Sequence, residues 1–384
     1  MCIPPCMLFT AGFSCTGRSR LNNTRKDNAD GIRLSKDDAT SVTWRGVYEY
    51  LKRCFPKMVA LENVVELDSK SLDDGSSSDA EFIHGKMIEM GYVGTYLQIQ
   101  ANQYGSACSR NRLYFLYFHG PDADAGRVHL LKQTISAIKL DFTIPPNSFL
   151  LPETDVAQWV SKLQDEAVNP RRKRKTEKYE DEHCNIFNAC GISWPPHCGI
   201  FNACGIPGEK SFAESLRALS ARRVECAIFC EAQWPFDAAA LPEDGIEIFD
   251  INFSLGRLVG LDGHINPWKN VPGCLTGSGR YWMRHQVMGV HGKPVLVHRL
   301  LHGAEVFAFA GFHPKFYGWK AVPDHEDIEE SDLLSSFGGN AFSAFAFGAA
   351  LLGLLAGHAK PGVAAQVPEP DSDEDREGGD SDAS

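Results

Sequence analysis

Two hydrophobic patterns alternate through the first 120 residues of the chain. Residues 41–55 and 80–90 carry apolar side chains at near-helical spacing, and Pro56 ends the first of these two predicted helices. Helices and strands that follow one another along a chain are typical of an α/β fold. The strands are predicted from runs rich in β-branched, aromatic and aliphatic residues, at 58–67, 91–101 and 112–118.

The pattern is weaker outside this region. Residues 1–35 are polar after a short apolar patch, so we expect a long loop there. Beyond about Pro145, the clearest predicted strands are Val224–Phe229 and Lys293–Val297. The apolar run Phe342–Leu355 is shorter than the ~20 residues that cross a bilayer, so it predicts a buried helix and no membrane partner.

A polar pair stands near the end of the most apolar predicted strand. Residues 58–67 read Met-Val-Ala-Leu-Glu-Asn-Val-Val-Glu-Leu, which places Glu62 and Asn63 at the carboxyl end of a buried strand. Ligands of open α/β sheets bind at the carboxyl ends of strands. The pair is therefore either a solvated strand end or part of a binding site.

The charge of the chain limits its partners only in part. The formal net charge of -11 argues against a generally basic coat for nucleic acid, but a local basic cleft remains compatible with it. The run Arg171–Lys175 is either a solvated linker or a patch for nuclear import or nucleic acid. The chain has twelve cysteines and shows no secretory leader, so we expect reduced thiols that serve as core residues, ligands or nucleophiles.

Short motifs occur along the chain in one particular order, and in that order the sequence resembles the cytosine-5 DNA methyltransferase family. The resemblance spans most of residues 5–120 and 298–356. It implies an α/β fold in which a partial S-adenosylmethionine-dependent methyltransferase (Rossmann-like) sheet is joined by a second, mixed target-recognition region. The motifs are Gly12-Phe13-Ser14, Glu62-Asn63-Val64, Arg110-Asn111-Arg112, the segment Arg299–Glu305, and Gly339-Asn340-Ala341.

The same resemblance implies four segments. Residues 1–145 form a portion of the catalytic domain, and residues 146–297 form a linker and the target-recognition region. Residues 298–360 return to the catalytic domain. Residues 361–384 form an acidic tail that is too poor in apolar side chains to offset its ordering entropy, so we expect it to be disordered.

The resemblance also implies a chemistry and a role for individual residues. In this family a cysteine thiolate adds to carbon 6 of a flipped cytosine, and carbon 5 then attacks the methyl group of S-adenosyl-L-methionine. Glu62 would bind the exocyclic amine and the ring nitrogen, and Asn63 would position the loop or the strand end. Arg112 would contact the base carbonyl and Arg110 would brace the site, although a paired-arginine strand is also compatible with an exposed face. The cofactor-contacting motif falls on Asn340 and Ala341.

The sequence departs from the family pattern at the nucleophile. Thr10 stands where the family has its cysteine, and a threonine hydroxyl does not replace a thiolate. A Pro-Pro-Cys segment ends at Cys6, four residues too early, and Cys6 is the nucleophile that the sequence predicts. Cys15 lies on the wrong side of the Phe-Ser pair, and Cys108 replaces the glutamine that opens the arginine motif.

The second departure concerns the cofactor. The Gly-rich strand and loop that precede the catalytic loop in the family are absent from the sequence. We therefore expect a truncated enzyme that binds S-adenosylmethionine poorly and transfers little or no methyl, and a sheet in which residues 58–67 have an open edge.

Three functions remain compatible with the sequence. The first is a nuclear DNA (cytosine-5-)-methyltransferase that acts on DNA as its partner. The second is a tRNA methyltransferase, because Cys274-Leu275-Thr276 resembles a Cys-Phe-Thr motif of the tRNA-methylating branch. The third is a non-catalytic nucleic-acid-binding protein derived from the fold. The oligomeric state does not follow from the sequence.

A short tandem duplication contains paired histidines and cysteines, and its spacing matches no usual structural zinc site. We therefore predict that the purified protein contains no tightly bound metal, as measured by elemental analysis. Stoichiometric zinc that disappears when Cys190 and Cys204 are changed to serine would contradict this prediction. The residues concerned are His183, Cys184, Cys190, His197, Cys198 and Cys204.

Overall fold

The computed structural model describes about half of the chain, and every structural statement below concerns that part. Besides isolated positions between them, the described residues are 6–14, 39–69, 77–121, 123–152, 245–251, 271–276, 279–288, 294–312 and 342–359. The repeat at 183–206, the basic run at 171–175 and the acidic tail lie outside it.

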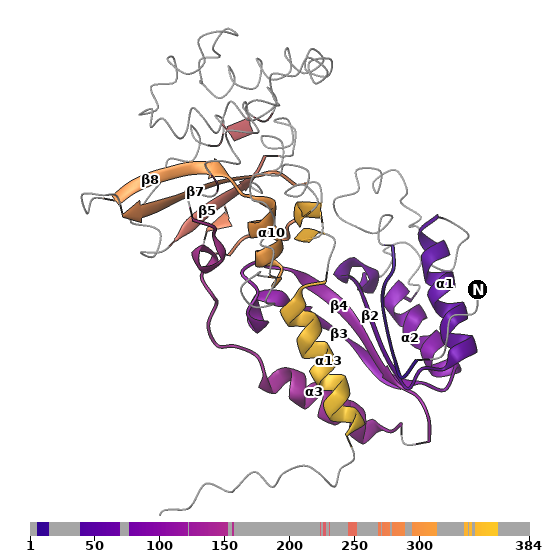
Figure 1. The fold of residues 1–384 in the computed structure, drawn as a ribbon. Helices are drawn as coiled ribbons and strands as arrows, with labels where there is room; N and C mark the ends of the chain where they lie inside the picture. Colours follow the sequence, from indigo (N-terminus) through magenta and orange to yellow (C-terminus); the bar gives the residue numbers. More distant parts are fainter. Residues whose placement is uncertain are drawn as a thin grey trace, which may run out of the picture.

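The first sheet has four strands in the order β1-β2-β4-β3 (Figure 1). Strand β1 runs parallel to β2, whereas β2 and β3 both pair with β4 in antiparallel register. A mixed sheet with helices between its strands confirms the predicted α/β class. The strands are β1 (Leu8–Gly12), β2 (Met58–Val64), β3 (Val93–Gln100) and β4 (Asn111–Phe118).

Helices cover both faces of this sheet because the side chains of β4 alternate between them. Leu113, Phe115 and Tyr117 face a core that includes residues of helices α1 (Ala39–Cys54) and α2 (Asp79–Glu89). Tyr114, Leu116 and Phe118 face a second core, which helices α3 (Ala125–Ala137) and α13 (Ala344–His358) complete. Three 3-10 turns complete the first sheet and its loops, at Val65–Asp68, Ala101–Tyr104 and Pro146–Phe149.

A second, antiparallel sheet follows, with strand order β6-β5-β7-β8. It is joined to the first by a buried apolar cluster that includes Cys108, Ile248, Leu275 and Phe309. This cluster places the segment before β4 against the second sheet. The elements are β5 (Ile246–Asp250), β6 (Trp268–Lys269), β7 (Tyr281–Met288), β8 (Pro294–Leu300) and helix α10 (Gly303–Phe309).

Three local predictions were wrong. The expected loop 1–35 contains β1, which forms because β2 offers a pairing partner some fifty residues away in the sequence. The same pairing covers one edge of β2, so that β2 has a neighbour on each side rather than an open edge. The segment 224–229 was predicted as a strand, but its described residues Cys226 and Ala227 are helical.

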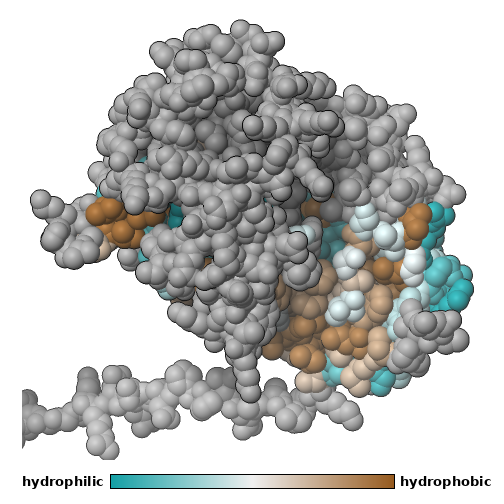
Figure 2. All heavy atoms as spheres, turned by 45° about the horizontal axis from the view of Figure 1, so that its top comes forward, coloured by the Kyte–Doolittle hydropathy of each residue, from teal (hydrophilic) through white to brown (hydrophobic). Residues whose placement is uncertain are grey.

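The run 342–355 became helix α13, as predicted, but only one side of it is buried. Leu352 and Leu355 are 53% and 52% exposed, and Figure 2 shows apolar surface on the described part of the molecule. Within the described residues, no helix is both long enough and apolar enough to cross a membrane.

Helix α13 approaches the sheet and α3 closely at glycines. A Cβ added at Gly357 would lie 2.6 Å from the Phe118 ring and 2.8 Å from the Arg127 carbonyl oxygen. A Cβ added at Gly348, in the same helix, would meet nothing within 4 Å. An alanine substitution at Gly348 therefore tests helix propensity alone, whereas the same substitution at Gly357 also tests close packing.

We expect Gly348→Ala to raise the free energy of unfolding by up to ~1 kcal/mol, because alanine favours a helix over glycine. We expect Gly357→Ala to lower it by ~1–3 kcal/mol, because the backbone of α3 cannot move away from the new methyl group without repacking. Urea denaturation of the two variants checks this. A stabilising Gly357→Ala would contradict the close approach of α13 to α3.

Candidate active site

The candidate site lies at the carboxyl end of β2. The register pairs Glu62 with Gly12 of β1 on one side and with Tyr114 of β4 on the other. A Cβ at Gly12 would lie unusually close to the Phe342 ring, at 3.2 Å, and in ordinary contact with Glu62 Oε2, at 3.6 Å. The Gly-Phe-Ser and Glu-Asn-Val motifs thus lie side by side.

The Glu62 carboxyl is buried and only partly satisfied. Its Oε1 lies 3.2 Å from Nε of Arg112, and the side chains of Arg112 and Glu62 are 17% and 12% exposed. Oε1 accepts no hydrogen bond within the described part of the chain. Burial raises the pKa of the Glu62 carboxyl, and the guanidinium groups of Arg112 and Arg110 oppose this increase.

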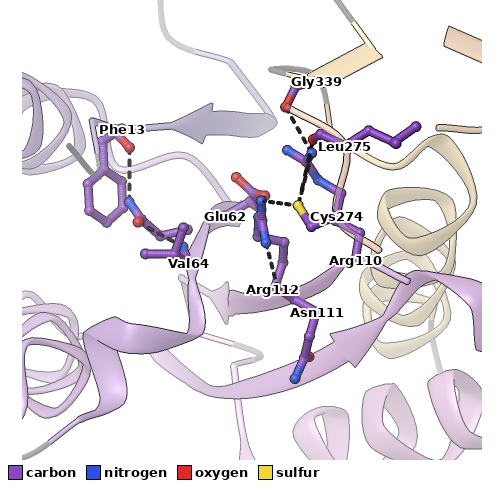
Figure 3. A network of polar contacts seen from close by, with 10 residues as sticks. Phe13, Glu62, Val64, Arg110, Asn111, Arg112, Cys274, Leu275 and Gly339 are labelled. Atoms are coloured by element: carbon purple, nitrogen blue, oxygen red, sulfur yellow. Dashed lines mark hydrogen bonds and ion pairs between the residues drawn. The ribbon is translucent and has the colours of Figure 1, made fainter. Parts of the chain in front are cut away.

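Arg110 and Arg112 approach this carboxyl from the start of β4 (Figure 3). They are two residues apart, so an extended backbone directs both side chains to one face. Arg110 is 5% exposed, and its Nη1 donates a hydrogen bond of 2.9 Å to the Gly339 carbonyl oxygen. Its Nε has no hydrogen-bond partner among the described residues. Arg112 Nη1 donates to the Asn111 carbonyl oxygen at 2.8 Å.

A cysteine from the second half of the chain completes the cluster. Cys274 Sγ accepts from Nη2 of Arg112 at 3.3 Å and from Nη1 of Arg110 at 3.9 Å (Figure 3). Sequence reasoning did not include Cys274 among the site residues. The signal that could have found it is the Cys274-Leu275-Thr276 motif, which was noted only as a resemblance to a tRNA-methylating branch.

The side chain of Asn63 binds backbone groups rather than the arginine cluster that Glu62 faces. It is 2% exposed, and its Nδ2 donates to the Phe13 carbonyl oxygen at 2.9 Å. Its Oδ1 accepts from the Val64 amide at 2.8 Å. The Ser14 amide, one residue after Phe13, donates to Thr43 Oγ1 of α1 at 2.9 Å. Asn63 therefore ties the segment that follows β1 to the end of β2.

The structure does not bring Cys6 to this cluster. Cys6 precedes β1 and is exposed, with its Sγ 3.3 Å from the hydroxyl of Tyr50. Gly12, at the other end of β1, is the residue beside Glu62. Six residues of extended chain separate the two ends by about 20 Å. Thr10 lies within β1 opposite Ala60, and Cys15 lies outside the described residues.

The location of the two residues predicted to contact the cofactor can be judged only from the residue that precedes them, Gly339. Asn340 and Ala341 lie outside the described residues. Gly339, which precedes them, is fixed beside the cluster by its hydrogen bond from Arg110. The described residues contain no group of three or more histidine, cysteine or acidic side chains that could hold a metal ion.

The raised pKa of Glu62 gives a stability test. The ordinary pKa of 4.5 applies to the unfolded chain, so the unfolded state loses its proton at a lower pH than the folded state. Glu62 therefore stabilises the fold most below pH 4.5, and this contribution falls as the pH rises through the folded pKa.

We expect the stability of the native protein, relative to Glu62→Gln, to decrease as the pH rises above 4.5. Urea midpoints of both proteins between pH 4 and pH 8 measure this difference. An increase over the same interval would mean that the attraction of the two arginines outweighs desolvation of the carboxylate.

Comparison with known proteins agrees with these motifs. Residues 3–192 match the family model of the C-5 cytosine-specific DNA methylase. Among solved structures, the chain matches the crystal structure of S. pombe Dnmt2 methyltransferase at 12% identity and a TM-score of 0.40, with 91% of this chain and 78% of that chain covered. The Entamoeba histolytica methyltransferase EhMeth is similar at 12% identity and a TM-score of 0.41, with 91% and 76% covered. No curated protein matches the chain. The match of residues 3–192 shows that this part of the chain is similar to the C-5 cytosine-specific DNA methylase family, whose members are methyltransferases.

Proposed function

We propose that this chain carries the catalytic region of an enzyme that transfers a methyl group from S-adenosyl-L-methionine to carbon 5 of cytosine in DNA, through a covalent thiol adduct, and that the given sequence by itself binds the cofactor poorly and transfers little methyl. The observation that supports the proposal is the state of Glu62. Its carboxyl is buried, has a raised pKa, and has an oxygen that accepts no hydrogen bond from the described residues. Such an atom at a strand end is a place where a ligand supplies the missing partner.

The polar groups at this site complement one edge of a cytosine ring. Cytosine offers an amine donor at N4 and acceptors at N3 and O2. A protonated Glu62 carboxyl donates its proton to N3 and accepts from N4 with its other oxygen. The Arg112 guanidinium lies 3.2 Å from that carboxyl and donates to O2. A base that is stacked in a duplex does not reach a buried carboxyl, so the cytosine is flipped out.

Glu62 also serves as the acid in the first chemical step. When a thiolate adds to C6, negative charge develops on the ring and collects at N3, beside the carboxyl. Transfer of the Glu62 proton to N3 neutralises that charge and leaves C5 electron-rich. The raised pKa supports this role, because burial makes the carboxyl hold its proton more tightly than an exposed glutamate does.

Two further residues position these groups. Arg110 holds the Gly339 carbonyl and places its positive charge near Glu62, and Asn63 holds the Phe13 carbonyl at the end of β1. S-adenosylmethionine, when bound, supplies an electrophilic methyl group to C5. Asn340 and Ala341 would contact this cofactor, because they continue the segment that Arg110 anchors.

The substrate class has an alternative that one observation favours. Cys274, which opens the Cys-Leu-Thr segment, contacts Arg112, so a motif that resembles the tRNA-methylating branch lies at the candidate site. A tRNA cytosine is therefore the second candidate substrate. Localisation in the nucleus stays a prediction that goes with DNA as the substrate and with the basic run 171–175.

Release of tritium from cytosine labelled at C5 tests the proposal. Thiolate addition makes C5 exchange its hydrogen with water, and methyl transfer releases it as well, so both halves of the reaction are measured. We expect Glu62→Gln and Arg112→Ala each to slow release by ~100-fold or more. We expect the dissociation constant for DNA to change by less than about threefold, because phosphate contacts dominate affinity.

The matched controls are Glu89→Gln and Arg53→Ala, whose side chains are 60% and 78% exposed and lie on α2 and α1. Both should release tritium at the native rate. Release that persists in Glu62→Gln would refute the assigned chemistry. Binding of DNA without any release by the native protein would instead support a non-catalytic binding protein. Release of tritium from tRNA but not from DNA would indicate that the substrate is RNA.

A further inference from the structure

We propose that Cys6 and Cys54 are an oxidation site, at which a hydroperoxide converts the two thiols into a reversible disulfide. The site lies at the end of β1 that is far from Glu62, and the inference does not depend on the proposed function. Both cysteines are free thiols in the structure. Of the six described cysteines, Cys6 is the exposed one, and Cys54 is half-buried.

The backbone brings the two cysteines to the same corner of the fold. The Met58 amide donates a hydrogen bond of 2.9 Å to the Met7 carbonyl oxygen, and the pairing of β1 with β2 begins at Leu8 and Met58. Cys6 directly precedes Met7, and Cys54 ends α1 a few residues before Met58. The start of β1 therefore lies against the short turn that links α1 to β2.

One phenol lies beside both thiols. Cys6 Sγ is 3.3 Å from the hydroxyl of Tyr50, which lies on α1 one helical turn before Cys54. Residues four apart on a helix share a face, so the Cys54 side chain lies on the side of α1 that carries Tyr50. The ring of Tyr50 is held in place by stacking on Phe9 of β1, with the ring centroids 4.6 Å apart.

The electrostatics of this corner agree with the placement of both sulfurs. Hydrogen bonding to Cys6 is the largest cause that raises the pKa of the Tyr50 hydroxyl above its usual value, and burial, the charges of both thiolates and a hydrogen bond to Cys54 raise it further. A phenol that keeps its proton can donate a hydrogen bond to a thiolate. Because Cys6 precedes β1 and is exposed, its side chain can rotate to Cys54 without disturbing the core.

The reaction balances with hydrogen peroxide as the oxidant. The Cys6 thiolate attacks one peroxide oxygen, the O–O bond breaks, and the leaving hydroxide takes up the proton that the thiol lost, which gives a sulfenic acid and water. The Cys54 thiolate then attacks the Cys6 sulfur, the S–O bond breaks, and a second water leaves with the proton of the Cys54 thiol. The two thiols lose two electrons in total, and one peroxide is reduced to two waters.

The exposed thiol reacts first because accessible thiols that have a second cysteine nearby are typical of sites that respond to oxidants. An external thiol reverses the bond by exchange. In a reducing compartment, disulfides of this kind are transient. The site is therefore compatible with the reduced thiols that the sequence predicts for the resting protein.

The bond would fasten β1 to α1. Beyond the other end of β1, the Ser14 amide already donates to Thr43 Oγ1 of α1, so the oxidised chain would be held to this helix on both sides of the strand. The disulfide also closes a loop of roughly fifty residues, which restricts the unfolded chain. The oxidised protein should therefore unfold at a higher temperature than the reduced protein.

Peptide mapping of the full chain tests the proposal. The native protein would be treated with hydrogen peroxide and its remaining thiols alkylated, and the tryptic peptides would be identified by mass spectrometry with and without dithiothreitol. Trypsin releases Cys54 in peptide 54–57, which has no other cysteine, and Cys6 in peptide 1–18. Fragmentation of the linked peptides then shows which cysteine of peptide 1–18 carries the bond.

We expect peptides 1–18 and 54–57 to be joined through Cys6, and we expect dithiothreitol to separate them. We also expect the melting temperature of the oxidised protein to exceed that of the reduced protein. Cys54→Ser should lose both the link and the rise in melting temperature. Mapping on the native protein does not depend on whether this variant folds.

The matched control is the double variant Cys2→Ser and Cys15→Ser, which should keep the link and the rise in melting temperature. A bond from Cys54 to Cys2 or Cys15 in the native protein would overturn the proposal. Oxidation of Cys6 to a sulfinic acid while Cys54 is still alkylated would overturn it as well, and so would a lack of any reaction with peroxide.

Discussion

The Glu62 carboxyl and the Arg112 guanidinium lie 3.2 Å apart where water has little access. When both groups of such a pair are ionised, removing them from water costs several kcal/mol per ion, and mutual attraction offsets this only when the remaining lone pairs and protons are also satisfied. The pair in this site does not meet that condition, because Glu62 Oε1 accepts no hydrogen bond from the described residues. The arrangement is therefore hard to explain as a device for stability.

A second buried pair in the same chain provides the contrast. Glu305 and Arg299 are also buried, but Glu305 accepts four hydrogen bonds. Two come from Arg299, at 2.8 and 2.9 Å, and the amides of Leu151 and His302 supply the others at 2.8 Å. That carboxylate caps α10 and has no capacity left for a ligand. The Glu305–Arg299 pair, whose side chains are 0% and 4% exposed, is thus completed by the protein itself, whereas the Glu62–Arg112 pair, at 12% and 17%, is not.

Contact between the two sheets builds the site around Glu62. The apolar cluster around Leu275 and Phe309 brings the second sheet against the segment that leads into β4. Three polar contacts then cross the junction, from Ser109 to Pro272, from Arg112 to Cys274 and from Arg110 to Gly339. Because this packing comes from apolar side chains, polar groups at the junction can remain partly unsatisfied without loss of the fold.

The sequence by itself determined the elements whose periodicity is local. The helices α1 and α2, the strands β2 to β4 and the apolar helix α13 follow from side-chain spacing. The order of the motifs pointed to Glu62, Asn63, Arg110 and Arg112, and the structure places all four at or next to the end of β2. Tertiary structure alone decided what lies far apart in the sequence. Strand β1 is five residues long and exists because β2 pairs with it, and Cys274 reaches Arg112 across 162 positions. A local pattern does not record such contacts, because they depend on which apolar faces find each other when the chain folds.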